Sequence, residues 1–234
     1  MKAIFKRELY AYFTTPIGYA YLVFYFVLSG CVFAYTTLFA MSADVSAYFS
    51  LMQLVLTVLL PLLTMKLLSE ERRQKTEQVW LTAPVPVTHV VLGKFLAAYV
   101  LFGTSLVLSS LSFLILTRYA EVKIAVLFGN LLAMLLLGGV VLAVGLFVSA
   151  LTENQLAAAV GTVGILLGFL ALSFVSQLVN VYWLRFILDG LSVYTRFRNF
   201  TQGVFDVMAM VYYLSLSGLF LFLTVRVYDR RRYL

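Results

Sequence analysis

The 234-residue chain contains few residues whose types and spacing could do chemistry. Gly93-Lys94 resembles the end of a phosphate-binding loop of the form G-x-x-x-x-G-K-[ST], but Thr88 and Phe95 occupy the first-glycine and hydroxyl positions. The acidic pair Glu70-Glu71 is accompanied by a single histidine, His89, which is poor support for metal or general-base chemistry. We therefore expect no catalytic, cofactor-binding or metal-binding residues. Any energy that the protein uses is expected to come from another chain or from an ion gradient.

The composition identifies the solvent in which these residues must be positioned. Hydrophobic residues make up 63% of the chain and charged residues 12%, against about 25% charged residues in soluble domains. Only helices and closed barrels satisfy their backbone hydrogen bonds in lipid. The apolar runs here are continuous and do not alternate with polar residues as barrel strands do. The sequence therefore predicts an all-α membrane protein.

Six apolar stretches are long enough to cross the hydrocarbon, which takes about 20 residues. They are Ile17–Ala40, Ala47–Leu68, Phe95–Leu116, Ile124–Ala150, Gln155–Asn180 and Val207–Val225. An even number of spans places both termini on one side of the membrane. The whole chain, residues 1–234, is interpreted as a single transmembrane domain.

The distribution of cations predicts which side that is. Twelve of the 17 Lys and Arg residues fall on the side of the termini, and cytoplasmic loops carry the excess of positive charge. Both termini are therefore expected in the cytoplasm. The same distribution explains the net charge of +7, so we expect no nucleic-acid partner.

A short amphipathic segment precedes the first span. Residues 4–13 place Ile4, Phe5 and Leu9 on one side of a helix and the basic residues mostly on the other, as in helices that lie in the membrane interface. Thr14 or Thr15 is expected to cap the next helix, and Pro16 suits its first turn. Lys66 and Lys94, near the inner ends of their spans, are expected to extend toward the headgroups.

The loop of residues 69–94 is the most informative cytoplasmic segment. Thr76 is a plausible N-cap for a short helix from Glu77 to Thr82, which Pro84 ends. This helix would expose Val79, Trp80 and Leu81. It could fill the groove of a partner protein, or Trp80 could simply lie at the headgroup level, and the segment alone does not separate these interpretations.

The same loop resembles the ABC-2 family of permeases, in particular the gliding-motility-associated ones. The resemblance is carried by Glu71, Lys75-Thr76-Glu77, Leu81-Thr82-Ala83-Pro84-Val85 and Val91-Leu92-Gly93-Lys94, against a family pattern of roughly E-x-x-x-G-T-x-E-x-L-L-x-x-P-V followed by G-K. Lys75 stands where the family usually has Gly, and the second acid is shifted by one position. The specific part covers about 25 residues, and six spans with an N-terminal amphipathic helix fit the remaining chain.

The resemblance implies a permease subunit of an ABC exporter in a bacterial inner membrane, with ATP and Mg²⁺ bound by a separate ATPase. Two ATPase chains and a second permease, identical or related, are the implied partners besides the lipid. The implied contacts with the ATPase are Glu71, Thr76, Glu77, Val79, Trp80, Leu81 and Pro84 in a coupling helix region, and Glu153 and Asn154 in a second, smaller contact.

Two further patterns concern the spans. Small residues, which let membrane helices approach closely, form stripes at Gly138, Gly145, Ala157, Gly161, Gly164 and Gly168. They indicate either packing within the subunit or a surface that slides during transport. A pathway for transported cargo would be lined by apolar groups and a few polar residues, namely Gln53, Asn130, Gln177 and Asn180.

Two other function classes remain open beside the exporter. One is a membrane scaffold or signalling subunit that binds an ATPase without moving cargo. The other is a gradient-driven transporter, which is disfavoured because we expect no charged residue in the middle of a span.

Overall fold

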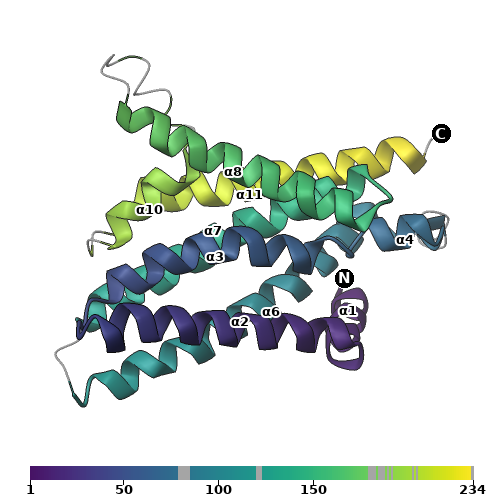
Figure 1. Ribbon diagram of the computed structural model, residues 1–234. Coiled ribbons are helices and arrows are strands. Elements are labelled where there is room, and N and C mark those ends of the chain that lie inside the picture. The colour runs from purple at the N-terminus through teal and green to yellow at the C-terminus, as the bar shows by residue number, and fades with distance from the viewer. Residues whose placement is uncertain are drawn as a thin grey trace.

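The computed structural model describes residues 1–78, 85–119, 123–178, 183, 188, 190, 192–201, 203 and 205–232. Every regular element in these ranges is a helix (Figure 1). In chain order they are α1 (Lys2–Thr14), α2 (Pro16–Phe33), the π-helix η1 (Ala34–Phe39), α3 (Val45–Thr64), α4 (Ser69–Arg73), α6 (Val87–Leu116), α7 (Ile124–Leu151), α8 (Gln155–Leu178), α10 (Val193–Thr201) and α11 (Val207–Arg232).

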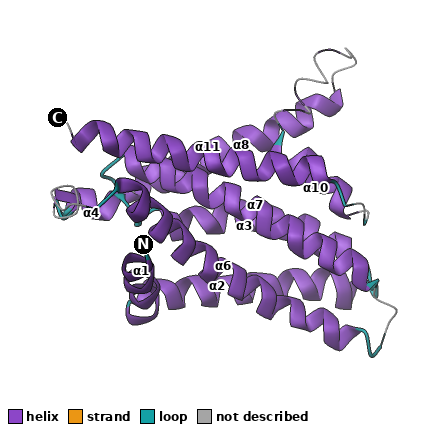
Figure 2. Cartoon of the chain, turned by 180° about the vertical axis from the view of Figure 1, so that it is seen from behind, coloured by secondary structure: helices purple, strands orange, loops and turns teal. Residues whose placement is uncertain are grey.

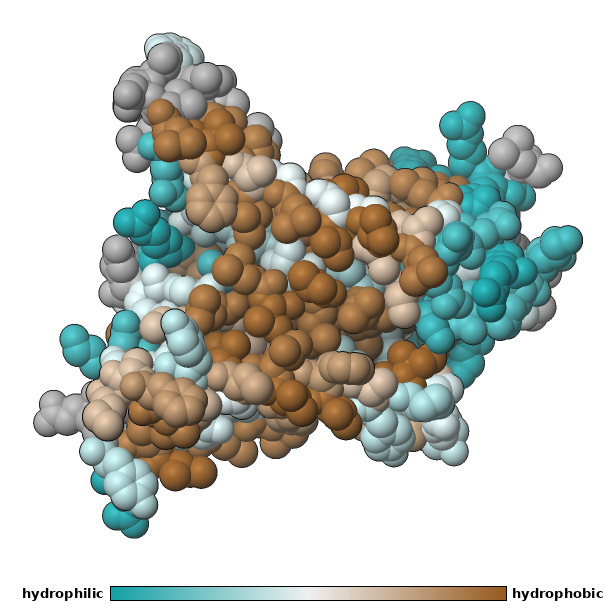
Figure 3. Space-filling model, in the orientation of Figure 1, coloured by the Kyte–Doolittle hydropathy of each residue, from teal (hydrophilic) through white to brown (hydrophobic). Residues whose placement is uncertain are grey.

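Six helical segments in the described ranges are long and apolar enough to cross a membrane, as the sequence predicts. They are Pro16–Phe39, Val45–Arg73, Val87–Leu116, Ile124–Leu151, Gln155–Leu178 and Val207–Arg232. Figure 3 shows a broad hydrophobic band over the middle of the molecule, with hydrophilic residues gathered at one end. The chain therefore has the architecture of an all-α, multi-pass membrane protein.

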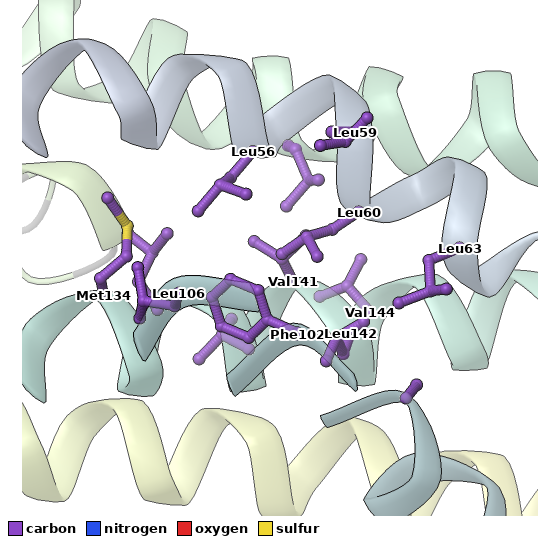
Figure 4. Close-up of a cluster of buried hydrophobic side chains, with 14 of the residues drawn as sticks. Leu56, Leu59, Leu60, Leu63, Phe102, Leu106, Met134, Val141, Leu142 and Val144 are labelled. Carbon is purple, nitrogen blue, oxygen red and sulfur yellow. The ribbon is translucent and has the colours of Figure 1, made fainter. Parts of the chain in front are cut away.

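Helix α7 forms the centre of the bundle. It packs against α3, α6, α8, α10 and α11. Of its most apolar 18-residue stretch 67% is buried, against 17% for the corresponding stretch of α11. In Figure 4, leucines of α3 (Leu56, Leu60), Phe102 of α6 and valines of α7 (Val141, Val144) face one another, and all five are at most 1% exposed. Burial among other helices, rather than contact with lipid, is what distinguishes α7 from the outer spans.

Close helix contacts in this core depend on two of the small residues that the sequence indicates. A Cβ atom on Gly138 would overlap the Phe102 ring, and one on Gly145 would overlap the Thr64 hydroxyl. Gly161 approaches Val148. Gly164 and Gly168 have no described atom within 4 Å of a Cβ, and Ala157 is exposed. The small residues of α7 therefore pack within the subunit, whereas most of those of α8 face outward.

The N-terminal helix lies across one end of the bundle (Figures 1 and 2). It runs from Lys2 to Thr14, slightly beyond the expected residues 4–13. Thr15 has extended backbone angles and occupies the N-cap position of α2, with Pro16 directly after it. The Thr15 hydroxyl does not cap α2, because it donates to the carbonyl oxygen of Ala11 at 2.8 Å. The turn between the helices is therefore closed from the α1 side.

Both termini and α4 lie at the same end of the bundle (Figures 1 and 2). Helix α6 begins there at Val87, with Pro86 in the N-cap position, which is eight residues before the expected start of the third span. Pro86 lacks an N–H and suits this position. The last part of the expected loop is therefore helical, and Lys94 lies in the third turn of α6 rather than ahead of it.

Candidate functional site

Lys94 is the centre of a buried ionic cluster at the end of the bundle that carries the termini. Its Nζ atom lies 2.9 Å from Oε1 of Glu71 on α4 and 3.2 Å from Oε1 of Glu8 on α1. Lys94 is only 1% exposed. The expectation that Lys94 extends toward the headgroups is therefore wrong, because two carboxylates from other helices enclose its ammonium group.

Arg7 completes this charged cluster, which we define as Arg7, Glu8, Glu71 and Lys94. Arg7 Nη2 lies 2.6 Å from Oε1 of Glu8 and 3.4 Å from Oε1 of Glu71. Burial opposes the ionisation of Glu8, but the Lys94 and Arg7 cations outweigh it and hold the pKa of Glu8 below its ordinary value. Two cations and two carboxylates thus neutralise one another where α1, α4 and α6 meet.

A second set of bonds ties α4 to the C-terminal end of α7. The Ser149 hydroxyl accepts from the backbone N–H groups of Leu68 at 3.2 Å and Ser69 at 3.0 Å. Arg72 donates to the carbonyl oxygen of Leu151 at 2.8 Å and lies 3.0 Å from Glu153. These groups satisfy helix-end donors and acceptors that would otherwise lack partners. They fix α4 to the turn between α7 and α8.

That turn contains both residues of the expected smaller contact. Glu153 pairs with Arg72. The side-chain oxygen of Asn154 accepts from the backbone N–H of Leu156 at 2.9 Å and so caps the start of α8. Both residues thus have a structural role in the chain itself, and Glu153 remains exposed at the surface of this end.

The C-terminal arginines reach back to the same region. Arg231 donates from Nη2 to the carbonyl oxygen of Ala150 at 2.8 Å, and its Nη1 atom lies 3.9 Å from Oε2 of Glu77. Arg232 donates to the carbonyl oxygen of Val85 at 3.3 Å. The end of α11 therefore contacts residues on both sides of segment 79–84.

The expected coupling residues fall into two groups. Glu71 belongs to the charged cluster, and the Thr76 hydroxyl donates to the carbonyl oxygen of Glu71 at 3.2 Å. Glu77 faces Arg231 and is largely covered, so it is not a well-solvated charge. The other four residues lie outside the described part of the chain: Val79, Trp80, Leu81 and Pro84.

A backbone feature distinguishes the turn before this segment. Lys75 has a φ of 56°, in the left-handed region that favours glycine and is uncommon for other residues. The turn is closed by the backbone N–H of Thr76, which donates to the carbonyl oxygen of Glu71 at 2.9 Å. Position 75 thus requires a conformation that glycine adopts at no steric cost.

At the opposite half of the bundle, polar residues line a cavity of about 300 Å³ between α3, α8 and α10. Gln53 and Gln177, two of the polar residues that the sequence indicates, both contribute to it. The Gln53 side-chain oxygen is buried without a partner among the described residues. Asn130 lies apart on α7, where its amide donates to the carbonyl oxygen of Val126, and Asn180 is outside the described residues.

Sequence reasoning did not predict the contacts that Glu8, Ser149 and Arg231 make at this end of the molecule. One signal was present for Glu8, because it is four residues from both Ile4 and Tyr12 and so interrupts the apolar side of α1. Ser149 and Arg231 carry no such signal, since their partners come from distant segments. No protein-family model matches the chain, and no curated protein matches it.

Proposed function

We propose that the chain is the transmembrane permease subunit of an ATP-driven ABC exporter, coupled to a separate ATPase through the segment between α4 and α6. The observation that carries the proposal is the set of bonds around that segment. The residues before it bond to α1, α6, α7 and the α7–α8 turn. Both flanks also contact the end of α11. A force on this loop would therefore reach most of the bundle.

The left-handed backbone at Lys75 supports the resemblance to ABC-2 permeases. The family usually has glycine there, and glycine adopts positive φ without steric cost. The departure from the family pattern thus changes the residue without changing the turn.

The polar cavity between α3, α8 and α10 supports a pathway for cargo. Gln53, Gln177 and several hydroxyl side chains line it, although α3 and α8 have the length and apolar character of membrane spans. Polar groups facing hydrocarbon without partners are costly. Water, cargo or a second permease subunit would remove that cost, which favours a paired permease over a lone scaffold.

The orientation of the proposed permease can be tested by thiol labelling, using exposed positions at the two ends. In a Cys31→Ser background, Tyr119→Cys is expected to react with an impermeant thiol reagent added to intact cells, and Arg73→Cys only after lysis. The reason is the excess of cations at the end that carries Arg73. The opposite labelling pattern would place α4 outside and contradict the coupling proposal.

The ATPase partner is tested through Trp80. If this aromatic side chain inserts into an ATPase groove, Trp80→Ala should weaken binding by about 2 kcal/mol or more, roughly thirtyfold. The measurement is the amount of ATPase that purifies with the permease in detergent, together with its rate of ATP hydrolysis.

Arg73→Ala is the matched control, because Arg73 is exposed on the neighbouring helix α4. It should retain the ATPase. Full recovery and normal hydrolysis with Trp80→Ala would mean that Trp80 only anchors the loop at the headgroups, and the coupling assignment would move to the turn at Glu153 and Asn154.

A further inference from the structure

A second cavity, of about 290 Å³, lies at the end of the bundle between α1 and the junction of α3 with α4. Its lining combines apolar and charged residues. Ile17, Leu63 and Leu67 are apolar, whereas Lys66 and Glu70 are charged. The cavity also borders the charged cluster, through Glu8, Glu71 and Lys94, and it borders Thr76.

Two of the charged groups around this cavity, one cation and one anion, have no ion-pair partner among the described residues. Lys94 and Arg7 are paired with Glu8 and Glu71, so these carboxylates are already engaged. Within the described part of the chain, the Glu70 carboxylate accepts only a hydrogen bond from the Gln74 side chain, at 3.3 Å. Among the described residues, no carboxylate lies within ion-pair distance of Lys66, and Lys66 and Glu70 do not pair with each other. The cavity therefore offers a separate cation and a separate anion.

Tyr12 adds an unsatisfied polar group to the same wall. It lines the cavity and is 8% exposed, and its hydroxyl has no partner among the described residues. Buried polar groups in proteins nearly always have a partner. The Tyr12 hydroxyl therefore needs a partner that the described residues do not supply.

We propose that this cavity binds the headgroup of a phospholipid that carries a primary ammonium group, such as phosphatidylethanolamine. Its phosphate would pair with Lys66 and its ammonium group with Glu70, while its glycerol and proximal acyl carbons lie against Ile17, Leu63 and Leu67. A volume of about 290 Å³ is at the small end of ligand pockets and suits a headgroup rather than a whole lipid. The cavity lies beside α1 and α4, which stand at the end of the bundle that carries the termini (Figures 1 and 2), and lipid headgroups would lie at that end of the spans.

The test is native mass spectrometry of the purified protein after exchange into micelles with equal amounts of phosphatidylethanolamine, phosphatidylcholine and phosphatidylglycerol. Phosphatidylethanolamine should be retained preferentially, because its ammonium group donates hydrogen bonds that a trimethylammonium cannot. Lys66→Ala and Glu70→Gln should each lower this retention by about fivefold or more. Lys75→Ala and Arg73→Ala, which do not line the cavity, should leave retention unchanged.

Three results would overturn the proposal. They are equal retention of the three lipids, a preference for phosphatidylglycerol that is insensitive to Glu70→Gln, and retention unchanged in both cavity variants. A competition with soluble phosphoethanolamine separates a lipid from a free metabolite. Displacement at equal concentration would contradict a lipid ligand, and none is expected because the soluble molecule lacks the apolar part. No ATPase is needed for these measurements, so their outcome is independent of the proposed function.

Discussion

Replacing Lys94 with methionine is expected to lower the free energy of unfolding by about 3–5 kcal/mol, the cost of removing one partner from a buried ion pair. Lys94 is 1% exposed, and its ammonium group contacts Glu8 and Glu71 at once. Without it, two carboxylates from different helices lie close together. Only Arg7, which is more exposed, remains to pair with them. The measurement is equilibrium unfolding in detergent, followed by circular dichroism.

Two further variants distinguish the ionic cluster from side-chain packing. Lys75→Met removes an exposed cation and should change stability by no more than about 0.5 kcal/mol. Adding Glu8→Gln and Glu71→Gln to Lys94→Met should recover most of the lost stability, because the uncompensated charges are gone. If the triple variant is as unstable as Lys94→Met alone, the effect arises from packing and not from charge.

Replacing Gly18 with alanine is expected to be about as damaging, with a loss of roughly 3 kcal/mol or more. A Cβ atom at Gly18 would overlap the carbonyl oxygen of Tyr12 and lie 2.8 Å from its carbonyl carbon. Overpacking typically costs about 1–3 kcal/mol, and here the obstructing atoms belong to the backbone and cannot rotate away. To make room, α1 must move away from α2 and disturb the contacts of Glu8.

Gly30→Ala is the matched control for Gly18→Ala, because both glycines lie in α2 and Gly30 has no described atom within 4 Å of a Cβ. It should be neutral or stabilising by up to about 1 kcal/mol, since alanine favours a helix interior over glycine. Thermal unfolding of both variants in the same detergent is the measurement. Equal stability of the two variants would show that α1 does not pack against α2 as described.

The contrast between Lys66 and Lys94 shows the limit of sequence reasoning at this site. Both lysines stand near the same end of apolar spans, and from the sequence both are expected to extend toward the headgroups. In the structure both lysines border the same cavity, but only Lys94 is enclosed by carboxylates, one of them 86 residues away in the sequence. Local hydropathy does not specify which carboxylates from distant segments lie beside a lysine, so it could not predict this difference.

Glycines show the same limit within the spans. Gly145 and Gly168 both belong to small-residue stripes at helical spacing. Gly145 contacts Thr64 closely, whereas Gly168 has no described neighbour within 4 Å. The spacing identifies a face that another helix can approach closely. Which helix lies on that face depends on how the six spans pack together.

The sequence by itself determined the all-helical membrane class, the six spans and the short amphipathic helix before the first span. These follow from the solvent, since uninterrupted apolar runs of this length must satisfy their backbone hydrogen bonds within one helix. Only the tertiary structure decided that α7 is central and that Glu8, Glu71 and Lys94 meet. These features depend on contacts between distant segments, and neither local hydropathy nor helical periodicity specifies which segments become neighbours.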